Sequence, residues 1–460
     1  MTGAFAVAID ARPRNAYRLI WRWHFYAGLW CLPFVLWLAV TGMIYLFKTQ
    51  IEPLLEQRYA HVTRATHQPP SAQVAAALKA VPGSVLNAYQ LPSSSEAATR
   101  VLVGSGPELT RVFINPSTLQ VLRVVWENDR FMRVIFHLHG ELLLGTGGSM
   151  AVELAASWTI FMLLSGLYLW WPRSRRLGGV VYPRWRHGQR VFWRDMHAVI
   201  GVWISCFALF LLVSGLPWSK SWGGMLHALR QTHAGTITSQ EWSIGSAHER
   251  AVTKLQDSPV AMPGMRMPGD DGAVVVRIDY SALDRLLPTV SAQHLAPPVL
   301  IAPPSQFKPA WTARSDADDR PKQVDLVLDG ATGGIVSRTA FSQRPLLDRI
   351  IGYGIAIHEG QLFPPLNQIL GVFTALGLIT LSASAVVMWW RRRPQGVLGA
   401  PPAHASTRYP RLLMSALVVL GCVLPLLGGS MLLVLLIERV CLRRLPRARH
   451  FLGLAAADHG

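Results

Sequence analysis

The sequence has little charge and little cysteine, and both shortages restrict what the chain can be. Only 15% of its 460 residues are charged and 51% are apolar, a balance typical of membrane proteins. Because all four cysteines lie in or beside apolar stretches, we expect no disulfide in the hydrophilic loops: Cys31, Cys206, Cys422 and Cys441. No Cys-x-x-Cys-His motif is present, which excludes a covalently attached haem.

Other signatures are also missing. No glycine-rich dinucleotide fingerprint follows a strand pattern, so the chain is not expected to bind its own nicotinamide or flavin cofactor. The first apolar segment is too long for a cleavable signal peptide and lacks a small-residue cleavage site, so we expect an uncleaved anchor. Few ionisable residues fall in the middle of an apolar stretch, which argues against a permease.

The apolar residues are concentrated in five stretches long enough to cross a bilayer, which takes about 20 residues. Trp and Tyr occur near the ends of these stretches, as is usual at membrane interfaces. The five predicted spans are Phe25–Phe47, Ser149–Trp171, Ala198–Trp218, Leu366–Trp390 and Leu412–Ile437.

The net charge of +18 does not indicate a nucleic-acid partner, because the basic residues cluster at the N-terminus and in two short loops. By the positive-inside rule these regions are cytoplasmic, and segments 48–148 and 219–365 are exported. We therefore predict a multi-pass protein of a bacterial inner membrane with a cytoplasmic N-terminus. The clustered residues are Arg12, Arg14, Arg18 and Arg22, then Arg173 to Arg194, and then Arg391 to Arg411.

The fifth stretch leaves two alternatives open. Pro425 and the pair Gly428-Gly429 interrupt it, and a basic tail follows. A single crossing would export that tail against the positive-inside rule, whereas a re-entrant hairpin would return it to the cytoplasm. We favour the hairpin.

Two sets of residues repeat along the chain at fixed offsets. An offset of 173 aligns His24, Gly28 and Trp30 with His197, Gly201 and Trp203. An offset of 219 aligns His139 with His358 and Trp170-Trp171 with Trp389-Trp390. The expected fold is a mainly α integral membrane helical bundle built from two tandem parallel repeats, 15–173 and 187–393, with two exported α+β inserts. The predicted domains are 1–47, 48–148, 149–218, 219–365, 366–411 and 412–460.

Periodicity predicts the elements of both inserts. The first should contain a helix followed by strands that include a turn at Asn115-Pro-Ser-Thr. The second should contain a hairpin around Asp329-Gly-Ala-Thr-Gly-Gly. The predicted elements are helix Ser71–Ala80, strands Ser84–Leu91, Arg100–Val103, Arg111–Ile114 and Leu119–Val125, helix Ala247–Leu255, and strands Val274–Ile278, Val324–Leu328 and Ile335–Arg338.

The repeated histidines suggest two non-covalent b-type haems held between helices. His24 and His197 would bind one iron near the cytoplasmic face, where Gly28 and Gly201, one turn away, leave room for the macrocycle. His139 and His358 would bind a second iron near the exported face, with His137 as the alternative to His139. A single interfacial histidine is more often a solvated anchor, but four in register across a duplication favour ligation.

Two arginines, Arg130 and Arg349, are 219 apart and precede the outer histidines. They are candidates for binding haem propionates, although both could be ordinary interfacial arginines. The Asp316-Ala-Asp318-Asp319 run lacks the spacing of a metal site and is interpreted as a solvated loop.

These motifs resemble those of the PepSY-associated transmembrane family of bacterial inner-membrane proteins. The resemblance rests on the two His-x3-Gly-x-Trp spans, the two turn motifs, His139-Gly140, and Gly166-Leu-Tyr-Leu-Trp-Trp-Pro-Arg with its echo Met388-Trp-Trp-Arg-Arg. One departure is Leu119, where the family prefers glycine. The resemblance implies PepSY-like inserts and a haem-dependent ferric-siderophore reductase that lies in the lipid bilayer. Its substrate would be a ferric siderophore. Its electrons would come from an external donor such as quinol, reduced flavin or a flavoprotein. The alternatives are a regulatory, partner-binding protein and a siderophore or haem permease.

Overall fold

The computed structural model describes residues 4–105, 108–172, 177–234, 278–305, 309–401 and 411–454. The predicted helix Ala247–Leu255 and all but the last residue of the predicted strand Val274–Ile278 lie outside these residues. The chain forms two compact units. Unit 1 comprises Met1–Met43, His137–Thr238 and Ile369–Gly460, and unit 2 comprises Ile44–Phe136 and Ser239–Gln368.

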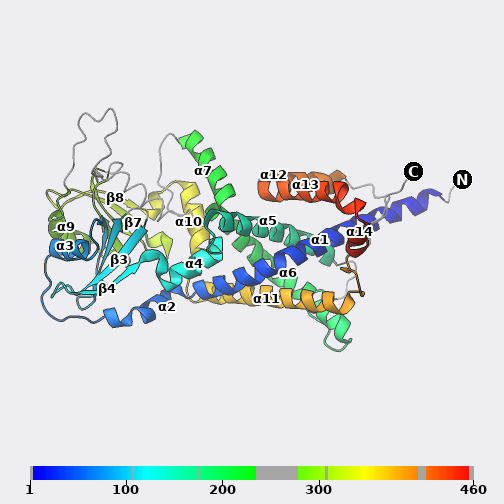
Figure 1. Ribbon diagram of the computed structural model, residues 1–460, viewed down its shortest axis with the longest axis horizontal. Helices are drawn as coiled ribbons and strands as arrows, with labels where there is room; N and C mark the ends of the chain where they lie inside the picture. The colour runs from blue at the N-terminus through cyan, green and yellow to red at the C-terminus, as the bar shows by residue number, and fades with distance from the viewer. Residues whose placement is uncertain are drawn as a thin grey trace. The chain divides into compact units, whose positions relative to one another are not determined.

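Long apolar helices dominate unit 1 (Figure 1). Among the described residues, five helical segments are long and apolar enough to cross a membrane by length and composition: Ala16–Tyr45, Gly145–Trp170, Gln189–Trp218, Leu366–Arg392 and Pro425–Arg444. The first four belong to α1 (Ala4–Tyr45), α5 (Gly145–Trp170), α6 (Gln189–Gly215) and α11 (Leu366–Arg392). The predicted number of apolar spans is confirmed among the described residues, with the fifth at Pro425–Arg444 and not at Leu412–Ile437. The chain is a membrane protein.

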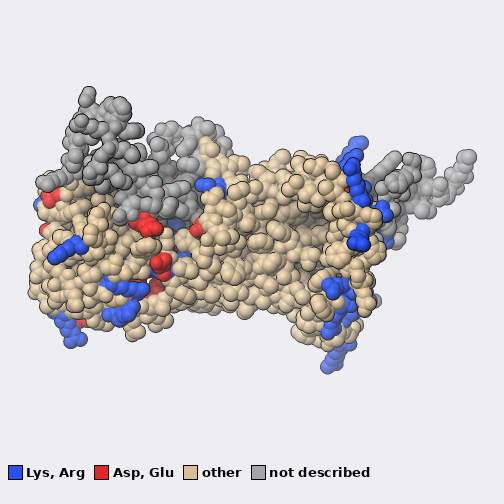
Figure 2. All heavy atoms as spheres, in the orientation of Figure 1, with Lys and Arg blue, Asp and Glu red and all other residues tan. Residues whose placement is uncertain are grey.

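Charge is unevenly distributed over the surface of unit 1. On the face that Figure 2 shows, Lys and Arg side chains gather at the end where α14 (Pro446–Leu452) lies. The broad band next to this end shows no charged side chain. Such a band is the surface that a bilayer requires, because hydrocarbon cannot solvate charge.

The fifth apolar stretch folds as two helices, α12 (Arg411–Val423) and α13 (Pro425–Val440), on either side of Leu424. They form a tight hairpin in which the backbones of Gly421 and Gly428 touch, so that a Cβ at Gly428 would lie 2.7 Å from the Gly421 carbonyl oxygen. Pro425 has no N–H and therefore suits the first turn of α13. The sequence range Leu412–Ile437 is thus not one continuous helix.

The two flanks of this hairpin meet at α1. Arg22 Nη1 donates to the carbonyl oxygens of Pro401 and Gly453, each at 2.9 Å. Tyr26 Oη donates to the Leu452 carbonyl oxygen at 2.5 Å. The chain before α12 and the chain after α13 are therefore held at the same end of unit 1.

The remaining helices are shorter. They are α2 (Lys48–Leu55), α3 (Pro70–Ala80), α4 (Phe131–Glu141), α7 (Lys220–Ala234), α9 (Ala282–Ser291) and α10 (Leu346–His358). Short 3-10 turns occur at Gln57–Tyr59, Glu127–Asp129, Leu216–Trp218, Arg320–Lys322, Phe341–Gln343 and Leu442–Arg444.

In the part of unit 2 that the structure describes, eight strands form one antiparallel sheet in the order β4-β3-β2-β1-β5-β6-β7-β8. The two predicted inserts share this sheet through the pairs Tyr89↔Ile301 and Gln90↔Leu300. Strands from both inserts pair side by side, so both inserts must lie on the same side of a membrane. The strands are β1 (Val85–Gln90), β2 (Thr99–Ser105), β3 (Glu108–Ile114), β4 (Val121–Trp126), β5 (Val299–Ala302), β6 (Trp311–Ser315), β7 (Val324–Leu328) and β8 (Ile335–Ala340).

The apolar core of unit 2 lies between the sheet and two helices, α3 and α9, which lie together beside it in Figure 1. Each helix directs small and branched side chains at the sheet, among them Val74 of α3 and Leu286 of α9, both fully buried. Alternate residues of the strands face them, such as Val101 and Val103 of β2, as period-2 strands require. Burial of this face by both helices ties the two halves of the sheet into one core.

The two predicted hairpin turns have the same backbone pattern. In the first, Leu119 N–H donates to the Asn115 carbonyl oxygen at 2.9 Å, and in the second Gly333 N–H donates to the Asp329 carbonyl oxygen at 2.8 Å. Asn115 Oδ1 and Asp329 Oδ1 each accept the N–H two residues later, as in an Asx-turn. Leu119 has φ +61° and Gly333 has φ +75°, so both occupy the left-handed region that favours glycine.

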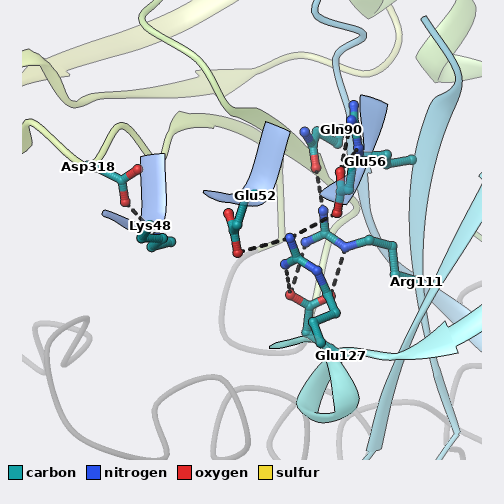
Figure 3. Close-up of polar contacts among 9 residues, drawn as sticks. Lys48, Glu52, Glu56, Gln90, Arg111, Glu127 and Asp318 are labelled. Carbon is teal, nitrogen blue, oxygen red and sulfur yellow. Dashed lines mark hydrogen bonds and ion pairs between the residues drawn. The ribbon is translucent and has the colours of Figure 1, made fainter. Parts of the chain in front are cut away.

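Ion pairs hold α2 against the first half of the sheet (Figure 3). Glu127 binds Arg111 Nε at 2.8 Å and Arg130 Nη1 at 2.7 Å. Arg130 Nη2 also contacts Glu52 and Glu56, each at 3.1 Å. We call these residues, with Arg100, which binds Glu56, the charge cluster. Although burial alone would raise the pKa of Glu127, the charges of Arg111 and Arg130 lower it to about 2.

Candidate functional site

Unit 1 brings together two of the predicted ligands. His24 on α1 and His197 on α6 face each other with their ring centroids 6.5 Å apart and their planes at 87°. Both side chains are half-buried. Two imidazoles bound to opposite sides of one metal, with nitrogen–metal distances of about 2 Å, would have centroids roughly 6 Å apart. The spacing of the rings therefore fits a single shared iron.

The Nδ1 atom of each histidine has a partner on the helix next to it. His24 Nδ1 lies 2.9 Å from Ser165 Oγ of α5. His197 Nδ1 lies 3.1 Å from the Leu381 carbonyl oxygen and 3.2 Å from Ser384 Oγ, both of α11. Within the described part of the chain, the Nε2 atoms of these two histidines make no hydrogen bond, so each Nε2 is available as a metal ligand.

The predicted glycines Gly28 and Gly201 face neighbouring helices. A Cβ at Gly28 would lie 3.6 Å from Met162 Sδ, and one at Gly201 would lie 3.1 Å from Leu381 Cδ1. Their contacts are thus with α5 and α11. It is Gly166 that adjoins a histidine ring, since a Cβ there would lie 3.2 Å from His24 Cε1. Gly166 therefore leaves room for the His24 ring.

A porphyrin iron needs only two axial protein ligands, and this pair supplies two. No group of three or more His, Cys, Asp or Glu side chains suited to a metal ion occurs among the residues that the structure describes. Paired imidazoles without acidic or thiol ligands suit a haem better than a free ion that needs four or more protein ligands. The donor set of this pair thus fits a b-type haem.

His139 also lies in unit 1, near the end of α4. Its Nδ1 is 3.0 Å from Thr41 Oγ1 of α1, and a Cβ at Gly42 would lie 3.0 Å from its Cε1. His137, the alternative, instead pairs through Nδ1 with Glu141 one turn along the same helix. His139 therefore shares with His24 both the hydroxyl partner and the adjoining glycine, whereas His137 shares neither among the contacts described.

His358, the fourth predicted ligand, is the last residue of α10 in unit 2. His139 and His358 thus belong to different units, and their pairing stays a prediction.

The two predicted propionate-binding arginines differ in their surroundings. Arg130 is occupied by Glu52, Glu56 and Glu127, and its side chain is only 14% exposed. These carboxylates give it a structural role in the charge cluster, which competes with the predicted propionate contact. Arg349 lies on α10, and its buried Nε has no hydrogen-bond partner among the described residues.

One acidic residue within the apolar helices also has a structural role. Glu153 of α5 is buried, and its carboxylate accepts the backbone N–H groups of Ser221 and Trp222 at 2.9 and 3.1 Å. These groups open α7 and would otherwise lack partners. The carboxylate therefore caps this helix.

The family comparison agrees with the helices and the sequence motifs. A family model described as the PepSY-associated TM region matches residues 21–392. The chain belongs to this family. The matched range begins just before His24 and ends with α11, so it includes all four predicted histidines of this PepSY-associated chain. No curated protein matches the chain.

The sequence reasoning missed the polar partners of the histidines. Ser165 and Ser384 are 219 residues apart, the same offset that relates His139 to His358. That offset would have found them, but serines in apolar helices are common and alone give no signal.

Proposed function

We propose that this protein is a di-haem b electron-transfer protein of the bacterial inner membrane that reduces ferric siderophores at the exported face. The observation that carries the proposal is the His24–His197 pair, whose 6.5 Å ring spacing suits two axial ligands of one iron. Family membership agrees with it. A bis-histidine haem supplies one-electron transfer, because both axial positions are filled.

The chain would position the inner haem through helices that are themselves fixed. His24 and His197 come from α1 and α6, and their Nδ1 atoms contact α5 and α11. Four long helices therefore set the orientation of both rings. Ligands held in this way need little rearrangement when charge at the metal changes, which favours rapid electron transfer.

The outer haem is assigned to His139 and His358, with Arg349 as the partner for a propionate. The Thr41 contact of His139 resembles the serine contact of His24, which supports His139 over His137. With the N-terminus in the cytoplasm, His24 and His197 lie near the cytoplasmic face and the outer pair lies near the exported face. Electrons would then cross from a cytoplasmic or quinol donor towards the exported sheet.

The substrate chemistry requires no acid, base or nucleophile of the protein. A ferric siderophore binds Fe(III) through hard oxygen donors, and one added electron gives Fe(II), which those donors hold less tightly. The electron comes from an external donor, such as quinol, reduced flavin or a flavoprotein. A two-electron donor would therefore reduce two chelates. The sheet of unit 2 would supply the surface on which the chelate docks.

The test is the haem content of the purified full-length chain, produced with a haem precursor. We expect b-type bands in a reduced-minus-oxidised spectrum and two haems per chain. His24→Ala or His197→Ala should lower this to one, as should His139→Ala or His358→Ala. His187→Ala is the matched control, because His187 is exposed and should leave both haems in place.

The catalytic part is tested with the dithionite-reduced protein, freed of excess reductant and mixed without oxygen with a ferric hydroxamate chelate. A ferrous-specific chelator should report one Fe(II) for each haem oxidised. A colourless wild-type protein would refute haem binding. A haem-loaded protein that is not reoxidised by the chelate would refute the reductase activity.

A further inference from the structure

Two serines beside the inner histidines share one hydrogen-bond arrangement. Ser165 Oγ donates to the Met162 carbonyl oxygen at 3.0 Å, and Ser384 Oγ donates to the Leu381 carbonyl oxygen at 2.8 Å. Each hydroxyl has a single proton, and that proton is committed to the serine's own helix. Towards the histidine, therefore, the serine oxygen can only accept.

This arrangement determines which ring nitrogen carries the proton. His24 Nδ1 is 2.9 Å from Ser165 Oγ, so His24 must donate an Nδ1–H. His197 Nδ1 faces Ser384 Oγ and a carbonyl oxygen, which are both acceptors. In a neutral imidazole with a proton on Nδ1, Nε2 bears the lone pair that binds a metal.

Thr41 repeats the arrangement beside His139. Its hydroxyl donates to the Trp37 carbonyl oxygen at 2.8 Å and lies 3.0 Å from His139 Nδ1. The same hydrogen-bond arrangement thus occurs at three of the four predicted ligands, and the three hydroxyl residues lie on three different helices. A chance packing of hydroxyls would not be expected to select Nδ1 each time.

We propose that Ser165 and Ser384 are positioning residues that hold the Nδ1–H tautomer of His24 and His197 and set the reduction potential of the haem between them. This inference rests on the proposed function. An acceptor at Nδ1–H makes the ligating nitrogen more basic, which favours Fe(III) over Fe(II). The two serines therefore lower the potential and tighten the ligation.

The two sites depend on serine in the same way. His197 keeps a backbone acceptor, the Leu381 carbonyl oxygen at 3.1 Å, when Ser384 is replaced. His24 likewise has a backbone hydrogen-bond partner, Met162, beside Ser165. Ser165→Ala and Ser384→Ala should therefore have effects of similar size.

The experiment compares Ser165→Ala, Ser384→Ala and Ser165→Thr in the full-length chain with Ser205→Ala. Ser205 is a buried serine of α6 whose hydroxyl donates to the Gly201 carbonyl oxygen at 2.5 Å, and it has no histidine partner among the contacts described. Two quantities are measured: the rate at which haem is lost to an excess of a haem-binding acceptor protein, and the midpoint potential by spectroscopic titration.

We expect Ser165→Ala to lose the inner haem about tenfold faster, as is typical when the hydrogen-bond partner of a metal ligand is removed. A tenfold shift in the preference for Fe(II) over Fe(III) would raise the midpoint potential by about 59 mV. Ser384→Ala should shift both quantities in the same direction by a similar amount. Ser165→Thr, which keeps the hydroxyl, and Ser205→Ala should match wild type.

The inference is overturned if Ser165→Ala and Ser205→Ala have equal potentials and equal rates of haem loss in a haem-loaded protein. It is also overturned if Ser165→Thr behaves like Ser165→Ala. Should Ser165→Ala not fold, the potential of Ser384→Ala decides, and an unchanged value refutes the proposal. A wild-type protein without haem would instead refute the proposed function, so the two failures are distinguishable.

Discussion

The two halves of the sheet in unit 2 have the same strand order, read outward from β1 and β5, but they are stabilised differently. The β1–β4 half contains the charge cluster, in which Glu127 and Arg111 have side chains only 12% and 11% exposed. In the β5–β8 half, the ion pair of Arg344 with Asp325 leaves the carboxylate 37% exposed. Two halves with the same strand order thus need not carry the same buried charges.

The sequence explains the difference. The positions 173 after Glu52 and Glu56 are Met225 and Leu229, and the position 219 after Glu127 is Leu346. The carboxylates that bind Arg130 therefore have no counterparts, although Arg349 matches Arg130 itself. Of these two arginines, 219 residues apart, Arg130 binds the carboxylates of the charge cluster, and Arg349 has a buried Nε without a hydrogen-bond partner among the described residues.

The largest loss of stability should come from Glu127→Ala in the β1–β4 half of the sheet. It leaves Arg111 and Arg130 with fewer counter-charges in a buried place, and breaking a buried ion pair costs about 3–5 kcal/mol. Amide hydrogen exchange of the full-length chain in detergent should show the loss of protection mainly in β2, β3 and β4.

Glu108→Ala is the matched control, because Glu108 lies exposed at the start of β3. It should leave exchange unchanged. Equal loss of protection in both halves of the sheet would contradict the distinction drawn between them.

The second-largest expected effect is a pH dependence of the stability of the β1–β4 half of the sheet. The pKa of Glu127 is lowered from 4.5 to about 2, so its stabilisation is complete above pH 4.5 and is lost as the pH falls towards 2. A depression of this size corresponds to about 3 kcal/mol. Urea unfolding of the full-length chain, followed by circular dichroism between pH 6 and pH 3, should show this loss.

Glu127→Gln removes the titrating group and should flatten that part of the pH profile. An unchanged slope in Glu127→Gln would show that other carboxylates cause the acid sensitivity.

The smallest effect concerns the two hairpin turns. Leu119→Gly should stabilise the first turn by about 1 kcal/mol. A left-handed φ costs a residue with a Cβ about 1–2 kcal/mol, and the larger loss of backbone entropy when glycine folds offsets part of this gain. Gly333→Leu should destabilise the second turn by more, since its Cβ would also lie 3.0 Å from the Arg285 carbonyl oxygen. Thermal unfolding of the full-length chain measures both.

Leu119→Ala provides the control, because it shortens the side chain but keeps the Cβ. A gain in stability equal to that of Leu119→Gly would mean that the leucine side chain, not its φ, causes the strain.

Local patterns predicted much of the fold. The apolar spans, the helix at Ser71–Ala80 and both hairpin turns follow from periodicity and turn residues within short windows. The departure at Leu119 was visible in the sequence and coincides with the left-handed position. The joining of the two inserts was not predictable, because β1 and β5 pair through backbone groups that any sequence carries.

The sequence predicted which residues form the candidate site better than it predicted the contacts that these residues make. Repetition singled out His24 and His197, which the structure brings together. The role of Gly28 and Gly201 beside a macrocycle stays a prediction, and the neighbours described for them are Met162 and Leu381. Which face of a helix meets its neighbour depends on packing across the bundle, and a single sequence does not specify that packing.

The pairing of β1 with β5 has a consequence for biosynthesis. The first half of the sheet is made long before the second, with membrane helices α5 and α6 between them. Until β5 arrives, β1 has an open edge of unpaired N–H and C=O groups, which invites pairing with other chains. The nascent protein therefore has an unpaired edge at β1 that is prone to aggregation. This edge is covered only after α6 is inserted and the strands β5–β8 have been synthesised.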